Sequence, residues 1–174
     1  MCWGLPRCTL QLRGITEMLT HDLDARFAKL IDDLPAALNA LLLCEPHCGG
    51  GPLPKEVPER AVYLFSEGDR YLSVGRTNRL RHRYREHCRQ RHNDAPFAFK
   101  FARIESGHVK AKGGLSRAAL EADEVFAEHF LAAKERVKQM EFRWVEETDP
   151  NRQCLLEIYA TVALNALHND FENH

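Results

Sequence analysis

The spacing of apolar residues changes at a segment rich in glycine and proline, and this change divides the 174-residue chain. Between residues 15 and 43 apolar side chains recur every three or four positions, as on one face of a helix that Pro35 can break in two. From residue 61 they alternate, as in a strand. Residues 45–58 hold three glycines and four prolines, a composition typical of a linker. We therefore expect a helical arm (1–44), a linker (45–59) and a main domain (60–174).

The main domain begins with a pattern typical of a β-hairpin. Residues 61–66 and 70–75 alternate on either side of a turn at 67–69. The later elements are expected, in chain order, as a helix (79–91), a strand (97–104), a helix (116–140), a strand (142–146) and a helix (150–165). Asp149 and Pro150 supply an N-cap and a first-turn proline for the last helix. This order predicts an α+β fold in which a small antiparallel sheet, starting with a hairpin, is flanked by helices.

Composition excludes several classes of protein. The chain is 44% hydrophobic and 28% charged, which excludes a disordered or collagen-like chain. Its longest apolar run, residues 34–44, is far shorter than the roughly 18 residues of a membrane-spanning helix. The first residues lack the pattern of a secretory signal. We therefore expect a cytoplasmic protein with no membrane partner.

Six cysteines are present, and some lie near a histidine. In a cytoplasmic protein such cysteines are expected to be free thiols. The alternative is a zinc site built from Cys44, His47 and Cys48, completed by Cys2 and Cys8. Their spacing fits no common zinc-ligand pattern, so free thiols are favoured.

Positive charge is concentrated on one predicted helix, although 24 Lys and Arg nearly balance 25 Asp and Glu overall. Residues 76–92 hold seven arginines and three histidines against a single acid, Glu86. Such a cluster is typical of a surface that binds phosphate, and a solvated helix face explains it equally well. Arg83 and His87 lie one turn apart beside the buried stripe, where a guanidinium can bind phosphate and an imidazole can move a proton. On spacing alone, an ordinary amphipathic helix remains the favoured interpretation.

Two further positions are candidates for chemistry. Glu157 is the one acidic residue between 153 and 167, and a single carboxylate can anchor Mg²⁺ when phosphate oxygens supply other ligands. Tyr63 lies on the first strand, and alternation places Tyr71 and Ser73 on one side of the second. If the hairpin pairs as expected, these residues face one pocket. Spacing alone favours a solvent-facing Glu157 and a structural Tyr63.

In chain order these residues resemble the GIY-YIG nuclease family. The first motif is present as Ala61-Val62-Tyr63 and the second as Ser73-Val74-Gly75. They are followed, in the order of the family, by Arg83, His87, Glu157 and Asn169. The likeness covers residues 60–170 and is closest to the restriction-endonuclease branch, in which a histidine follows the arginine by one helical turn.

The resemblance implies hydrolysis of DNA phosphodiester bonds with one divalent metal, usually Mg²⁺, with Mn²⁺ as an alternative. The implied roles are general base or water orientation for Tyr63 with His87, phosphate binding for Arg83, metal binding for Glu157, and positioning of Glu157 or a phosphate oxygen for Asn169. The implied nucleic-acid contacts are Tyr71, Ser73, Arg76, Asn78 and Arg79. Cutting both strands with one site per chain would favour a homodimer.

The chain departs from the family at Ser73, where the second motif usually has tyrosine. That tyrosine helps to hold the nucleophile, and Tyr71, expected on the same strand face, is the candidate substitute. The departure also supports a second hypothesis, a non-catalytic nucleic-acid-binding protein on a degenerate GIY-YIG scaffold. The helical arm has no counterpart in the minimal family domain, and its apolar stripe is expected to pack on the main domain or on a second copy of the chain.

Overall fold

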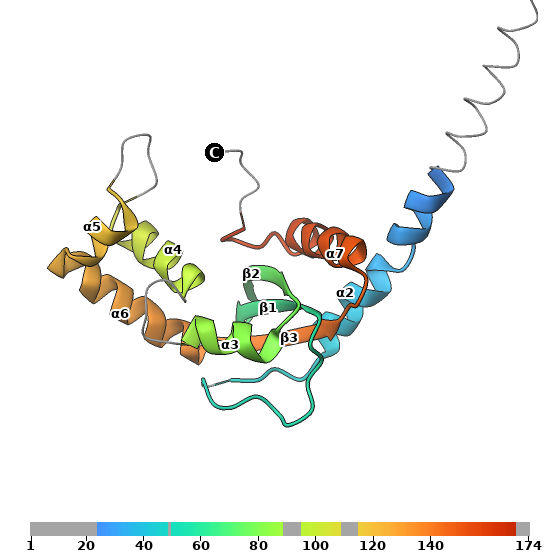
Figure 1. The fold of residues 1–174 in the computed structure, drawn as a ribbon, viewed down its shortest axis with the longest axis horizontal. Helices are drawn as coiled ribbons and strands as arrows, with labels where there is room; N and C mark the ends of the chain where they lie inside the picture. The colour runs from blue at the N-terminus through green and yellow to red at the C-terminus, as the bar shows by residue number, and fades with distance from the viewer. Residues whose placement is uncertain (1–23, 49, 89–94, 109–114, 170–174) are drawn as a thin grey trace, which may run out of the picture.

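The computed structural model describes residues 24–48, 50–88, 95–108 and 115–169, and in them a three-stranded antiparallel sheet lies between helices (Figure 1). β1 (Ala61–Glu67) is central, with β2 (Arg70–Thr77) and β3 (Glu141–Glu146) on its two sides. The turn between β1 and β2 contains Gly68 at φ +55°, a conformation that glycine adopts without a steric penalty. The predicted α+β class and hairpin start are confirmed.

Six helices with defined ends are described: α2 (Leu34–Leu43), α3 (Leu80–Cys88), α4 (Pro96–Glu105), α5 (Arg117–Glu121), α6 (Glu124–Gln139) and α7 (Pro150–Ala163). Residues 24–31 are also helical. The Asp149 carboxylate accepts the N–H groups of Asn151 and Arg152, which confirms the predicted start of α7. None of the described helices is long and apolar enough to span a membrane.

The expected strand over residues 97–104 is wrong, because this segment forms α4. Its three phenylalanines alternate with other residues as in a strand, but Ala98 and Ala102 are also apolar and lie one helical turn apart. Pro96 occupies the first turn, where its missing N–H removes no helical hydrogen bond. The helix packs against α6, with the Phe99 ring 5.1 Å from that of Phe126.

The expected long helix over 116–140 is divided into α5 and α6. Each part has its own cap: Ser116 Oγ accepts the N–H of Ala119, and the Asp123 carboxylate accepts the N–H of Phe126. The apolar spacing continues through the break, which is why periodicity alone did not reveal it.

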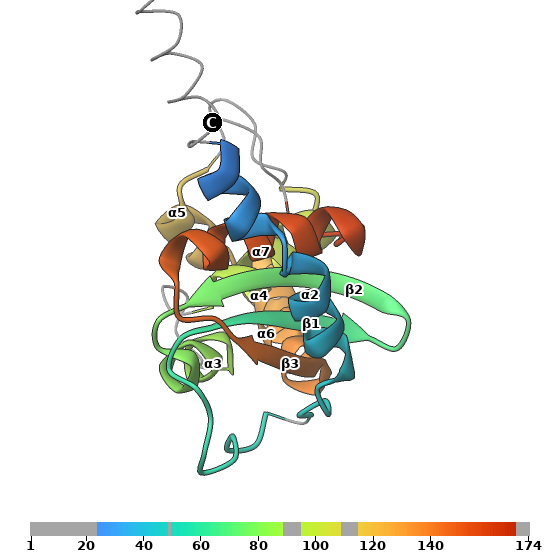
Figure 2. The same cartoon turned by 90° about the vertical axis from the view of Figure 1, so that its right-hand side faces the viewer.

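The side chains on the two faces of the sheet belong to two separate apolar cores. Tyr63, Phe65 and Leu72 face α3, α4 and α6, whereas Val62 and Leu64 pack with α2 and α7. Figure 2 shows α2 and α7 on one side of the sheet and α4 and α6 on the other. The apolar stripe of α2 therefore packs on the main domain, one of the two expected placements.

The segment before β1 is attached to the sheet and to α3. His47 exchanges two backbone hydrogen bonds with Phe142 at the outer edge of β3, both of 2.9 Å. The guanidinium of Arg81 on α3 donates to three consecutive carbonyls, those of Leu53, Pro54 and Lys55. These contacts fix the segment that the sequence suggested as a linker along one side of α3.

Candidate active site

The hydroxyl of Tyr63 is the centre of a buried hydrogen-bond cluster. Tyr63 lies in the middle of β1, and Arg83 and His87 come from successive turns of α3. Arg83 Nε donates to Tyr63 Oη at 3.3 Å, and His87 Nε2 lies 3.1 Å from the same oxygen. The helical spacing that placed Arg83 and His87 on one face thus directs both side chains toward Tyr63.

Burial determines the protonation states in this cluster. Tyr63 is 4% exposed and His87 is 3% exposed. Burial, assisted by the positive charge of Arg83, lowers the pKa of His87 from 6.5 to about 3, so the imidazole is neutral at physiological pH. Burial also raises the pKa of Tyr63 above its ordinary value of 10, against the opposing charge of Arg83.

These protonation states determine where the hydroxyl hydrogen of Tyr63 and the ring hydrogen of His87 lie. Because Arg83 donates to Tyr63 Oη, the phenol proton is free to point at His87 Nε2, which accepts it. The ring hydrogen of neutral His87 is then on Nδ1. That nitrogen is buried and has no hydrogen-bond partner among the described residues, a cost that a purely structural histidine would normally avoid.

Gly75 provides the space for the Tyr63 ring. The two residues are direct partners in the β1–β2 pair. A Cβ on residue 75 would overlap the ring and the hydroxyl of Tyr63. The last residue of the second motif is therefore glycine because the tyrosine of the first motif lies across it.

Glu157 reaches the same site from α7. A cavity of about 250 Å³, here called the tyrosine cavity, is lined by Tyr63, Arg83, His87 and Glu157 together. Glu157 Oε2 accepts a hydrogen bond from Arg76 Nε at 2.8 Å, forming an ion pair. Its negative charge adds to the burial effect that raises the pKa of Tyr63. Spacing alone favoured a solvent-facing Glu157, whereas in the structure this residue lines the tyrosine cavity.

A second cavity adjoins the first. This arginine cavity, of about 490 Å³, is lined by Arg76, Arg79, Arg83 and Glu157, with Asn78 also present. Three of the expected nucleic-acid contacts, Arg76, Asn78 and Arg79, therefore lie beside the carboxylate. Ser73, the fourth, lines the tyrosine cavity.

The donor set fits a magnesium ion that shares its ligands with a phosphate. Mg²⁺ usually takes one or two carboxylates, substrate phosphate oxygens and water molecules. Glu157 supplies one carboxylate in an open cavity, and Arg76 engages only its Oε2. In the described part of the chain no three His, Cys, Asp or Glu side chains form a metal cage, at Cys44 and His47 or elsewhere. Cys2 and Cys8 lie outside the described residues.

Among the described residues Asn169 hydrogen-bonds to β2, and no hydrogen bond to Glu157 is found. Of the two roles that the resemblance implied, positioning of Glu157 therefore has no support here, and binding of a phosphate oxygen stays a prediction. Asn169 Oδ1 accepts the N–H of Val74 at 2.8 Å, and its Nδ2 donates to the carbonyl of Val74 at 2.7 Å. The backbone N–H groups just before it donate to β2 as well, from Leu167 to Tyr71 and from His168 to Leu72. The chain after α7 therefore covers the outer edge of β2, and Asn169 holds the strand that carries the second motif.

Tyr71 lies on the other face of β2 from Ser73, so the expectation that it replaces the missing tyrosine is wrong. The β1–β2 register shifts between Phe65 and Ser66, leaving Leu72 as the extra residue of a β-bulge. The bulge reverses the alternation, and Tyr71 packs into the core formed with α2 and α7. The structure therefore does not support the nucleic-acid contact expected for Tyr71, because this residue packs against that core.

Two ionisable residues that line the tyrosine cavity were not predicted, Lys100 and His168. Lys100 was missed because its segment was assigned to a strand, whereas α4 presents it to the cavity. His168 packs its ring 4.5 Å from that of Phe101, and burial lowers its pKa. The sequence signal that could have identified His168 was its position next to Asn169, a residue of the predicted site.

Four side chains from β1, α3 and α7 thus converge on one cavity. Comparisons of the chain with protein-family models, with curated proteins and with solved structures find no match. The site is described by its geometry alone. The phenol of Tyr63 is in hydrogen-bond contact with the guanidinium of Arg83 and the neutral imidazole of His87, and the carboxylate of Glu157 lines the same cavity.

Proposed function

We propose that this protein is a divalent-metal-dependent endonuclease that hydrolyses phosphodiester bonds of DNA. The observation that carries the proposal is the convergence of Tyr63, Arg83, His87 and Glu157 on the tyrosine cavity. The same four residues, in the same order, carry the resemblance to the GIY-YIG nuclease family. The geometry of the cavity and the order of the motifs therefore support the same reaction, hydrolysis of a phosphodiester bond.

Tyr63 and His87 orient the attacking water. Tyr63 Oη donates a hydrogen bond to His87 Nε2, which leaves a lone pair of the phenol oxygen to accept a hydrogen bond from the water. Burial and the charge of Arg83 keep His87 neutral, so Nε2 stays available as the acceptor of the phenol proton. Arg83 Nε, 3.3 Å from the same oxygen, donates a second hydrogen bond that holds the phenol in place.

Arg83 and Arg76 are placed to bind the phosphate. Both line the arginine cavity beside Glu157, and a guanidinium binds phosphate oxygens through parallel hydrogen bonds. Arg76 would then exchange its ion pair with Glu157 for the phosphate, which leaves both carboxylate oxygens for a metal. When bound at Glu157, Mg²⁺ supplies further neutralisation of the charge on the phosphate and the leaving oxygen.

Two observations favour the alternative, a non-catalytic nucleic-acid-binding protein. The Glu157 carboxylate is already neutralised by Arg76, and the second motif lacks its tyrosine. On that hypothesis the two cavities hold a phosphate without hydrolysing it.

Cleavage of supercoiled plasmid with and without Mg²⁺ or Mn²⁺ separates the two hypotheses. We expect metal-dependent cleavage by the unmodified protein, and its loss in Glu157→Gln with DNA binding retained. Glu128→Gln, on the exposed surface of α6, is the matched control and should cleave normally. Binding without cleavage by the unmodified protein would support the alternative.

A further inference from the structure

The tyrosine cavity is one end of a row of cavities that continues along α3. It shares Arg83 and Glu157 with the arginine cavity. The arginine cavity shares Asn78 and Arg79 with a third cavity of about 470 Å³ at the start of α3. The third shares Arg85 with a fourth, of about 280 Å³, against the segment before β1. Shared lining residues make the row continuous.

The far half of the row is positively charged. Lys55, Arg79 and Arg85 line it and are exposed, and Glu59 is the one acid that lines the third cavity. No acidic side chain in the described ranges forms an ion pair with Lys55, Arg79 or Arg85. Exposed cations along a groove attract a polyanion and release its counterions on binding.

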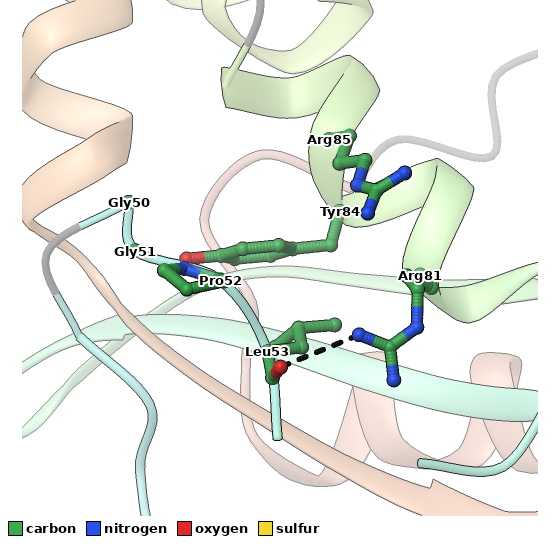
Figure 3. Close-up of a pocket in the computed structure, with 7 residues that line it drawn as sticks. All are labelled: Gly50, Gly51, Pro52, Leu53, Arg81, Tyr84 and Arg85. Carbon is green, nitrogen blue, oxygen red and sulfur yellow. Dashed lines mark hydrogen bonds between the residues drawn. The ribbon is translucent and has the colours of Figure 1, made fainter. Parts of the chain in front are cut away.

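The walls of this half are held in place before any ligand binds. Figure 3 shows the fourth cavity, in which Arg81 turns to the carbonyl of Leu53 while Arg85 projects separately from the same helix. With its bonds to the next two carbonyls, Arg81 fixes the wall opposite α3. Ordering the wall in advance lowers the entropic cost of binding, because the loop need not be ordered by the ligand.

We propose that the row is a binding track for the phosphate backbone of the DNA strand that flanks the cut. The strand would run from the tyrosine cavity across Asn78 and Arg79 to Lys55 and Arg85. This inference rests on the proposed function and adds the path of the substrate away from the reacting phosphate. The segment before β1 then forms one wall of the track, and Arg81 is a positioning residue for it.

Binding of duplex DNA measured over a range of salt concentrations, in EDTA so that no cleavage occurs, tests the track. Each phosphate contact contributes about 0.9 to the slope of log K against log salt. The double variant Lys55→Ala/Arg85→Ala should therefore lower the slope by about 1.8. Arg26→Ala/Lys29→Ala removes the same charge from exposed positions on helix 24–31 and should leave the slope unchanged.

The outcomes separate the track from the proposed function. If Lys55→Ala/Arg85→Ala keeps the original slope while Arg83→Ala lowers it, the track is wrong and the site remains. An equal decrease in the Arg26→Ala/Lys29→Ala control also contradicts the track, because the effect is then one of net charge. If the unmodified protein does not bind DNA, the proposed function fails first. In cleavage, the track variant should raise KM and leave kcat unchanged.

Discussion

The ring of Tyr63 lies across Gly75, its direct partner on β2, in the space that a Cβ would occupy. This contact joins the last residues of the two motifs, which are separated in the sequence but adjacent in the sheet. It also fixes the hydroxyl where Arg83 and His87 both reach it. The position of the phenol therefore depends on a residue that has no side chain.

Substituting Gly75 should displace the phenol. In Gly75→Ala the new methyl group forces the Tyr63 ring to move, at a cost of about 1–3 kcal/mol in stability. If Tyr63 orients the attacking water, cleavage should fall by about 10²-fold or more. Thermal unfolding and single-turnover cleavage measure the two effects. A Gly75→Ala protein with the original cleavage rate would show that the position of Tyr63 is unimportant.

The buried His87 should make the protein less stable in acid. Its pKa is about 3 in the folded protein and near 6.5 when unfolded, so between these values the unfolded chain binds more protons. Stability should therefore fall as pH is lowered through this window, by up to about 1.4 kcal/mol for each pH unit. His87→Phe removes the titrating group, so its unfolding free energy should depend less on pH between 6 and about 4. Chemical denaturation at several pH values tests this, and parallel profiles for the two proteins would contradict it.

Replacing Arg83 should affect both rate and binding. Arg83→Lys keeps the charge but loses the planar fork and the Nε contact with Tyr63, so cleavage should fall by about 10²-fold or more. Because a positive charge remains, the salt dependence of DNA binding should change little. Arg83→Ala should lose the same activity and also lower the salt slope by about 0.9. Equal cleavage by Arg83→Lys and the unmodified protein would remove the transition-state role.

Asn169 should act on β2 rather than on the metal. Asn169→Ala leaves the N–H and carbonyl of Val74 without their partners, which should cost about 1–3 kcal/mol in stability. Hydrogen exchange at the Val74 amide should accelerate, while the Mg²⁺ concentration needed for half-maximal cleavage should not change. A large shift in that concentration, with unchanged exchange at Val74, would instead restore the role that the resemblance implied.

Local sequence signals correctly predicted the elements that are determined by neighbouring residues. The hairpin was predicted from alternation around a glycine turn, and α7 from the Asp149 cap with Pro150 behind it. The strand expected at 97–104 was wrong because three alternating phenylalanines outweighed the helical pair Ala98 and Ala102. Here tertiary packing against α6 decides the structure.

Contacts between segments that are distant in the chain could not be predicted from the sequence. The bulge that turns Tyr71 to the other face arises from how β1 and β2 pair, not from residue spacing. The bonds of Asn169 to Val74 depend on how the chain after α7 returns to the edge of β2. The pairing of Arg76 with Glu157 likewise joins β2 to α7. Motif order singled out Tyr63, Arg83, His87 and Glu157, and the fold shows that these side chains line one cavity.

The most direct test of the account is the rate of single-turnover cleavage of a labelled DNA duplex by the unmodified protein and by Tyr63→Phe in the presence of Mg²⁺. Tyr63→Phe keeps the ring over Gly75 and removes only the hydroxyl that joins Arg83 to His87. The account predicts metal-dependent cleavage by the unmodified protein, with a rate at least about 10²-fold lower in Tyr63→Phe and an unchanged affinity for DNA. Equal rates for the two proteins, or no cleavage by either, would contradict it.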